Sequence, residues 1–278
     1  MEKYPGYRKM SLRELQLLQL NAMKEIHTVC VKNNITYYII AGTLLGAVRH
    51  GGFIPWDDDI DIAMMRNDFE KFKSIFSKEF DIEKYFLQHY GTDVDFRPAL
   101  MRVCIKGTIL DLPSEYHLKN CKNSYLDIFP LDNVPDDMNY RRKQVKDMRN
   151  IAKIIKLKLY RFYEENSVFK KKAKQLISFF LSIYPLKFLQ KNIVNIMTRY
   201  DNEKTKCVAS MASQYSYFKQ TMDRRIYGNP ILVKFEDTFL FAPENKEKYL
   251  IQLYGEDYMK IPPLNKQRTP QDVYILKK

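Results

Sequence analysis

Four of the five residues from Asp57 to Asp61 are aspartates, and this run constrains the chain more than any other feature. The four carboxylates repel one another at neutral pH, in a protein whose formal net charge is +13. An exposed acidic loop is the simplest alternative, but Ile60, Ile62 and Ala63 indicate that the segment is partly buried. Buried carboxylates must be paired, hydrogen-bonded or bound to a metal. The run therefore predicts a divalent-metal site.

The segment before this run has the features of a phosphate-binding turn. A buried strand is predicted over residues 35–40, because the run is β-branched and aromatic. It leads into a Gly42-Thr43 turn, followed by a short helix over residues 43–50. Amide N–H groups at such a helix start point outward and bind anions such as phosphate. We therefore expect Gly42 and Thr43 to bind substrate.

Two further strands carry the carboxylates. A strand predicted over residues 59–65 places Asp59 and Asp61 on the same face, roughly 6–7 Å apart. A strand predicted over residues 124–129, closed by the proline that follows it, supplies a third carboxylate, Asp127. Such a set can hold two metal ions ~3.5–4 Å apart, which stabilise an in-line displacement at phosphorus. Asp127 would be a metal ligand, the general base toward an incoming hydroxyl, or both; an aspartate out of register beside a turn is the alternative.

Magnesium is the expected cofactor, with manganese as the alternative, because magnesium binds carboxylates together with substrate phosphates. The four cysteines and four histidines are scattered, so no cluster of nitrogen or sulfur ligands favours zinc. Asp57 and Asp58 are expected to have supporting roles. Asp58 points to the opposite strand face, and Asp57 sits at the entrance of the strand.

Four other residues are candidates for binding substrate. Arg49, His50 and Arg102 are placed to add positive charge against a pyrophosphate, although surface solvation is the commoner explanation of each. Trp56 belongs to the segment that we expect to shape the donor pocket. A Walker A loop is absent, and a Ser-His-Asp triad is poorly supported because there are few histidines and no nucleophile elbow.

The remaining periodicity predicts an α+β fold with a helical insertion. Residues 1–136 are expected to form a catalytic core, residues 137–206 a basic helical insertion, and residues 207–278 the rest of the catalytic domain. The predicted elements of the core are a helix over 11–33 that starts with a capping box, a helix over 67–80, strands over 85–90, 97–105 and 108–112, a hairpin over 232–241 and a helix over 246–254. Those of the insertion are helices over 141–164, 168–183 and 186–202.

The insertion carries a basic and apolar stretch. Residues 176–189 are strongly apolar, but Pro185 interrupts them and they are too short to span a bilayer. Lysines at 170–174 stand just before them. Basic residues beside an apolar, aromatic helix are typical of an interfacial membrane helix. The alternative is a helical core whose lysines form a solvated face.

Composition narrows the class of protein. The 46 Lys and Arg outnumber the 33 Asp and Glu, which favours nucleic acid, an anionic membrane or phosphorylated substrates as partners. The cysteines form no C-x-x-C pair, which indicates reduced thiols in a cytosolic protein. We expect neither a secretory signal nor a membrane-spanning helix.

The run from Gly42 to Ile62 (GTLLGAVRHGGFIPWDDDIDI) closely resembles the signature of the LicD family. The resemblance continues through Arg102 to Thr108, through YLDIFPLD at 125–132, and through YGEDYM at 254–259 with the following Pro-Pro. It covers most of the chain except about 137–206. It implies a nucleotidyltransferase-like fold, with Asp59, Asp61 and Asp127 as metal ligands and Gly42-Thr43 as the phosphate turn.

The resemblance also implies transfer of a phosphorylated alcohol from a CDP-activated donor. Bacterial members transfer phosphocholine from CDP-choline to sugar hydroxyls of teichoic acid precursors or lipopolysaccharide, and other members transfer ribitol phosphate from CDP-ribitol. We expect a phosphocholine transferase that acts on a lipid-linked glycan precursor, peripheral at the inner face of the cell membrane. A ribitol phosphate or glycerol phosphate transferase is the first alternative. A non-catalytic nucleic-acid or lipid-surface binding protein is the remote one, and we expect no nucleic acid partner.

Overall fold

The computed structural model describes residues 3–112, 122–158, 172, 176, 179–180, 183–267 and 270–277. The chain forms two compact units. The first consists of residues 1–132 and 207–278, and the second of residues 133–206.

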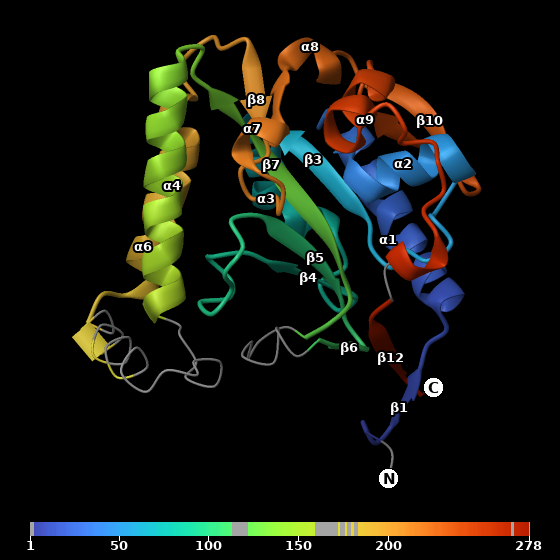
Figure 1. Cartoon of the computed structure of the whole chain (residues 1–278). Helices are drawn as coiled ribbons and strands as arrows, with labels where there is room; N and C mark the ends of the chain where they lie inside the picture. Colours follow the sequence, from blue (N-terminus) through green and yellow to red (C-terminus); the bar gives the residue numbers. More distant parts are fainter. Residues whose placement is uncertain are drawn as a thin grey trace. The chain divides into compact units, whose positions relative to one another are not determined.

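The first unit is built on a mixed sheet (Figure 1). Its strands run in the order β2-β3-β7-β5-β4, and β8 and β9 extend it by pairing with β7 and with each other. Strands β3 and β7 are parallel, whereas the pairs β2–β3, β7–β5, β5–β4 and β8–β9 are antiparallel. The strands are β2 (Tyr38–Ile39), β3 (Asp61–Met65), β4 (Tyr85–Gln88), β5 (Met101–Ile105), β7 (Tyr125–Val134), β8 (Cys207–Ala209) and β9 (Thr221–Asp223). The predicted α+β class is confirmed.

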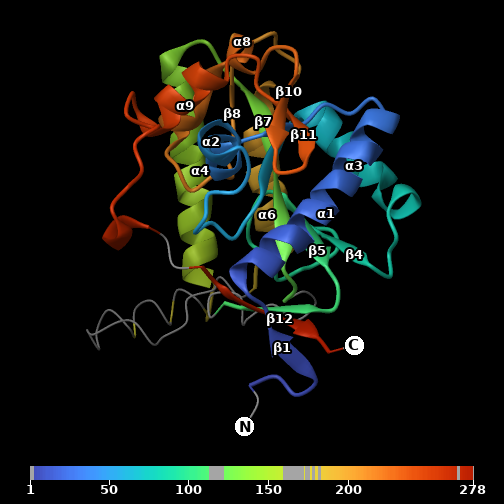
Figure 2. The same cartoon turned by 90° about the vertical axis from the view of Figure 1, so that its right-hand side faces the viewer.

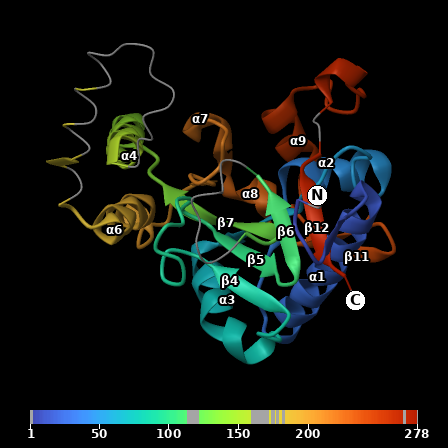
Figure 3. The ribbon, with the colours of Figure 1, turned by 90° about the horizontal axis from the view of Figure 1, so that it is seen from below.

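Helices cover both faces of this sheet. Helices α1 (Leu12–Lys32) and α3 (Arg66–Glu79) lie on one side, and α2 (Ala41–His50) and α9 (Lys246–Tyr254) lie on the other (Figures 2 and 3). The predicted capping box at the start of α1 is present. Ile60 and Ile62 are fully buried in the core, which leaves the alternate residues of β3 for the opposite face.

Several predicted boundaries were wrong. The helix α2 begins at Ala41, so Gly42 lies in its first turn and not in a turn before it. Strand β3 begins at Asp61, two residues later than predicted. Strand β5 begins at Met101, because residues 98–100 form bends before it. Strand β7 continues past Pro130 to its end at Val134. One missing N–H removes one ladder hydrogen bond and does not end a strand whose other residues pair with β3.

Two smaller sheets complete the unit. Strand β12 (Asp272–Leu276) pairs with β1 (Tyr7–Lys9) on one side and with β6 (Thr108–Asp111) on the other, so both ends of the chain lie together (Figure 1). The predicted hairpin is confirmed as β10 (Ile231–Phe235) and β11 (Thr238–Ala242). Strands β1, β8, β9 and β12 were not predicted. The remaining short elements are α7 (Tyr217–Gln220), α8 (Arg224–Tyr227) and η4 (Leu264–Lys266).

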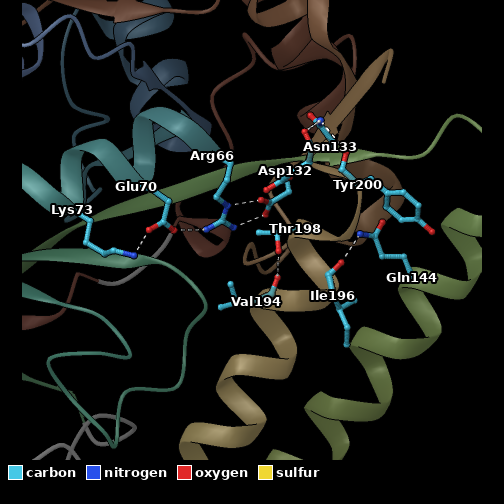
Figure 4. A network of polar contacts seen from close by, with 11 residues as sticks. Arg66, Glu70, Lys73, Asp132, Asn133, Gln144, Val194, Ile196, Thr198 and Tyr200 are labelled. Atoms are coloured by element: carbon cyan, nitrogen blue, oxygen red, sulfur yellow. Dashed lines mark hydrogen bonds and ion pairs between the residues drawn. The ribbon is translucent and has the colours of Figure 1, made fainter. Parts of the chain in front are cut away.

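The second unit contains α4 (Met138–Lys158), α6 (Leu186–Met197) and η3 (Thr198–Tyr200). Near the start of α4, Gln144 donates from Nε2 to the carbonyl oxygen of Ile196 at 2.8 Å, so α4 and α6 run in opposite directions (Figure 4). An ion pair between Arg199 and Asp147 joins the same ends at 2.8 Å. The predicted helix 168–183 and the lysines at 170–174 lie mostly outside the described residues. No helix in the described part of the chain is long and apolar enough to cross a membrane.

Candidate active site

A cavity of about 860 Å³ opens in the first unit. Its walls come from the start of α2, the acidic run, β7, residues 212–215 and residues 254–266. The acidic residues that line it are Asp57, Asp59, Asp61, Asp127 and Asp257. The basic ones are Arg49, Lys260 and Lys266. Acidic side chains therefore outnumber basic ones in this cavity, although the whole chain is strongly basic.

A row of polar residues crosses the sheet, and its two aspartates line this cavity. Asp61 on β3 is the register partner of Asp127 on β7, and Asp127 is the partner of Arg102 on β5. Arg102 is in turn the partner of Gln88 on β4. Residues in register on neighbouring strands project from the same face. Asp61 and Asp127 are therefore neighbours on the face of the sheet that borders the cavity.

Arg102 holds Asp127 in place and does not line the cavity. Its Nε atom donates to Oδ1 of Asp127 at 2.9 Å, and its side chain is only 7% exposed. The guanidinium carbon lies 3.7 Å from the ring centroid of Tyr125 and 5.2 Å from that of Phe96. This stacking fixes the planar group between two rings. We expected Arg102 to bind substrate; the structure places it behind a carboxylate that faces the cavity.

Thr43 also has a supporting position outside the cavity lining. Its hydroxyl oxygen accepts a hydrogen bond from the backbone N–H of Asp61 at 2.8 Å, and the residue is buried. The carbonyl of Asp61 accepts from the N–H of Ile40 at 3.1 Å. Both the N–H and the carbonyl of Asp61, the first residue of β3, are thereby hydrogen-bonded to residues at the start of α2. Gly42, one position earlier, does line the cavity.

The start of α2 is open to the cavity. Its N-cap residue, Ile40, makes no side-chain hydrogen bond to the first turn, and uncapped helix starts favour anions. The backbone N–H of Ala41 donates to the hydroxyl of the buried Tyr249 at 3.3 Å. A Cβ atom on Gly42 would lie 2.7 Å from Oδ2 of Asp57. The absence of a side chain at Gly42 thus lets the acidic run approach the helix start.

Two of the aspartates in the acidic run face different cavities. Asp57 lines the main cavity, whereas Asp58 is buried and lines a small second one. Oδ2 of Asp58 accepts from the backbone N–H of Gln271 at 2.5 Å. The amides of Gln16 and Gln19 on α1 donate to the carbonyls of Asp57 and Asp58, both at 2.9 Å. Helix α1 therefore fixes the backbone of the acidic run. The carboxylates of Asp57 and Asp58 face different cavities.

Arg49 and Trp56 line the cavity, and His50 lies beside Trp56. Arg49 lines it, but its Nη1 donates to the carbonyls of Tyr258 at 3.0 Å and Lys260 at 3.1 Å. Burial lowers the pKa of the Arg49 guanidinium. His50 lies outside the lining and meets the lining residue Trp56 edge to face, with ring centroids 6.0 Å apart. Burial, and secondarily the charge of Arg49, lower the pKa of His50.

The donor atoms available here fit a hard divalent cation. Asp57, Asp58 and Asp59 each offer a carboxylate oxygen, and these atoms lie within 4.8 Å of one another. Asp59, Asp61 and Asp127 all line the main cavity, and no histidine or cysteine does among the described residues. Oxygen ligands of this kind suit magnesium or manganese. We favour the set facing the main cavity, because Asp58 is turned toward Gln271.

Sequence reasoning missed most of the aromatic and basic residues of the lining. Tyr215, Tyr254, Tyr258, Lys260 and Lys266 come from the last quarter of the chain. Two of these tyrosines belong to the YGEDYM run at 254–259, which resembles the LicD family. That resemblance was the sequence feature that could have identified them as site residues. The sequence around Tyr215 contains no motif that predicts a site residue. Tyr215 lies in a loop before α7 and lines the cavity from there.

Paired aspartates on adjacent parallel strands, beside an uncapped helix start, suit a phosphotransferase enzyme. The chain belongs to the LicD family. The family model described as LicD/FKTN/FKRP, nucleotidyltransferase domain, matches residues 34–192.

Relatives extend this match. The chain is 29% identical over 276 residues to the lipopolysaccharide cholinephosphotransferase LicD of Haemophilus influenzae, covering 97% of this chain and 100% of that protein. It is 37% identical over 139 residues to an uncharacterized protein of Rickettsia prowazekii, covering 50% of this chain and 47% of that one. A shorter match, 52% over 69 residues, links it to an uncharacterized protein of Rickettsia typhi, covering 25% and 22% of the two chains.

Proposed function

We propose that the protein transfers phosphocholine from CDP-choline to a sugar hydroxyl of a cell-surface glycan precursor, of the teichoic acid or lipopolysaccharide kind, and releases CMP. The observation that carries this proposal is the end-to-end similarity to a protein named as a lipopolysaccharide cholinephosphotransferase. The row of Asp61 and Asp127 across β3 and β7 supports it, because paired carboxylates suit phosphoryl transfer.

Each residue of the site has a proposed part in the reaction. Asp59, Asp61 and Asp127 would hold magnesium or manganese, which when bound neutralises charge on the pyrophosphate. Gly42, at the open start of α2, would let a phosphate approach the helix amides. Lys260 and Lys266 line the same cavity and would pair with phosphate oxygens.

The bond changes are those of a substitution at phosphorus. The acceptor hydroxyl oxygen forms a bond to the phosphorus that carries choline, and the bond from that phosphorus to the CMP oxygen breaks. CMP leaves with the electron pair of the broken bond. The hydroxyl proton passes to a carboxylate of the cavity, and Asp127 is our candidate acceptor because Arg102 fixes its position.

The donor is tested by comparing CDP-choline, CDP-ribitol and CDP-glycerol with the purified protein, magnesium and a lipid-linked glycan fraction. We expect CMP release from CDP-choline to exceed release from either polyol donor by about tenfold or more. A preference for CDP-ribitol or CDP-glycerol would establish the alternative donor and contradict the proposal. Omitting the glycan fraction gives the background rate of donor hydrolysis.

We also propose that the second unit contacts an anionic membrane surface at the inner face of the cell membrane. Phe179 and Ile183 are 69% and 75% exposed, and Phe180, Tyr184 and Phe188 are exposed as well. Two exposed lysines of α6 accompany this apolar stretch: Lys187 lies within it, and Lys191 follows it. Exposed rings beside lysines suit the interface of an anionic bilayer, where each lysine contributes about 1 kcal/mol.

Sedimentation with vesicles tests this contact. We expect the protein to sediment with phosphatidylglycerol vesicles and less with phosphatidylcholine vesicles. The triple variant Phe179→Ser, Phe180→Ser, Ile183→Ser should lose most of this binding. Phe239→Ser, which changes a ring on β11 of the first unit that is 57% exposed, is the control. Equal sedimentation of the triple variant and the control would contradict the proposal.

A further inference from the structure

The cavity has an aromatic wall that the phosphate chemistry does not use. Trp56, Tyr215, Tyr254 and Tyr258 all line the cavity and pack partly against the hydrophobic core. The ring centroids of Tyr215 and Tyr254 are 6.3 Å apart, and the ring planes meet at 87°. Two rings at this angle form a corner whose surfaces are set by packing. Because they pack against the core, these rings are held in place before any ligand arrives.

This wall lies next to the carboxylates that face the cavity. Tyr254 ends α9, and α9 packs beside α2, whose first turn carries Gly42 (Figure 1). Burial is the main cause that raises the pKa of Tyr254, and the nearby Tyr215 and the negative charge of Asp61 raise it further. Tyr254 and Asp61 line the same cavity, and Tyr249 of α9 accepts a hydrogen bond from the N–H of Ala41 at the start of α2 at 3.3 Å. A group bound on this wall would be adjacent to a phosphorus held at Asp61.

Charged residues of both signs lie beside this wall. Asp257 lies between Tyr254 and Tyr258 in the chain and lines the same cavity. Arg49 also lines it, but its guanidinium donates to the backbone carbonyls of Tyr258 and Lys260. That cation therefore anchors the segment that carries Tyr258. Asp257 itself forms an ion pair with Lys260 at 2.8 Å, so the ring faces are the main attraction that the wall offers a cation.

We propose that Tyr215, Tyr254 and Tyr258, together with Trp56, form the subsite for the quaternary ammonium of the transferred phosphocholine. The inference rests on the proposed function and names the part of the site that would select choline. Aromatic faces attract a trimethylammonium group by about 0.5–2 kcal/mol for each ring, and Trp and Tyr do so best. The two-carbon chain of choline keeps its nitrogen near the phosphorus, which matches the position of the wall beside Asp61. A polyol has no such charge for the rings to attract.

The test compares CDP-choline with its neutral isostere, CDP-3,3-dimethylbutanol, in which a tert-butyl group replaces the trimethylammonium. Wild-type protein should prefer CDP-choline in kcat/KM by about tenfold or more. Tyr215→Leu and Tyr254→Leu should each reduce that preference by about threefold to tenfold, with a smaller effect on the neutral donor. Tyr254→Phe keeps the ring and should retain most of the preference. Phe239→Leu, on β11, is the control for loss of an aromatic side chain.

The outcomes separate the inference from the proposed function. A wild-type protein that uses CDP-choline but does not distinguish it from the neutral isostere would overturn the subsite alone. Equal losses for both donors in the Leu variants would overturn it as well, because they would show a role in shape or folding. A wild-type protein that turns over no CDP-choline and uses CDP-ribitol would overturn the proposed function itself.

Discussion

Nε of Arg102 donates to Oδ1 of Asp127 at 2.9 Å, and the two residues face each other across β5 and β7. The same register places Asp127 opposite Asp61 on β3. A shift of either strand by one residue would turn one of these side chains to the other face. The buried Arg102 therefore fixes the position of the Asp127 carboxylate that lines the cavity.

Removing the guanidinium should weaken both the fold and the reaction. Arg102→Met removes the cation that pairs with the Asp127 carboxylate. We expect the free energy of unfolding to fall by about 2 kcal/mol. This loss is smaller than for a wholly buried pair, because Asp127 is 19% exposed. Arg102→Lys keeps the charge but not the planar group between the rings of Tyr125 and Phe96. Urea unfolding measures stability, and the magnesium dependence of kcat reports the position of Asp127. If Arg102→Met needs no more magnesium than wild type, the positioning role is wrong.

The hydroxyl of Thr43 should be needed and its methyl group should not. Thr43→Val keeps the shape and removes the acceptor of the partly buried Asp61 N–H, which costs about 1 kcal/mol. Thr43→Ser retains the acceptor and should be closer to wild type in both thermal stability and kcat. Differential scanning calorimetry with a turnover assay distinguishes the two variants. A valine variant as stable as the serine variant would show that this hydrogen bond contributes nothing.

Two glycines of α2 should respond differently to alanine. A Cβ atom on Gly46 would lie 2.4 Å from the carbonyl oxygen of Gly52, which is backbone and cannot rotate away. Gly46→Ala should therefore destabilise the protein by about 1–3 kcal/mol. A Cβ on Gly42 meets only the end of the Asp57 side chain. Gly42→Ala should unfold near the wild-type midpoint but lose activity, and a larger loss of stability for Gly42→Ala than for Gly46→Ala would contradict this account.

The turn of the β10–β11 hairpin should give a pH-dependent contribution to stability. Glu236 accepts two hydrogen bonds from Arg13, at 3.0 and 2.6 Å, and one from the N–H of Phe53 at 3.1 Å. The bond from Arg13 is the main cause that lowers the pKa of Glu236 from its ordinary value of 4.5. A lowered carboxyl pKa stabilises the folded state above the unfolded pKa, and that stability is lost as the pH falls through the folded value.

Glu236→Gln should therefore cost about 1 kcal/mol at neutral pH, a modest amount because Arg13 is 53% exposed. The difference from wild type should shrink once the pH falls below about 4.5. Urea unfolding over a pH series measures it, with the exposed Glu256→Gln as control. A difference that stays constant down to pH values well below the ordinary carboxyl pKa would refute the assignment.

Local patterns predicted the elements around the site. The capping box of α1, the apolar strand before Ala41 and the alternation of Asp59, Ile60 and Asp61 are each set within a few residues. Asp59, just before β3, and Asp61, its first residue, line the same cavity as the alternation predicted, and Asp127 of β7 lines it too. The expected metal and the catalytic roles of these carboxylates remain predictions.

Long-range pairing was beyond local patterns. The register that joins Arg102 to Asp127 depends on residues 25 positions apart, and β12 pairs with β1 across nearly the whole chain. The position of Thr43 was missed because α2 starts earlier than expected. Each residue turns a helix by about 100°, so neighbouring Gly42 and Thr43 face in different directions.

Release of CMP from CDP-choline by wild-type protein, Asp61→Asn and Asp127→Asn is the most direct test of the acidic row as a metal-dependent phosphotransfer centre. We predict that a chelator abolishes wild-type turnover and that magnesium or manganese restores it. Each variant, shown by circular dichroism to be folded, should lose about a thousandfold in kcat, the equivalent of about 4 kcal/mol. Folded variants that turn over at the wild-type rate, or a wild-type rate that the chelator leaves unchanged, would contradict the account.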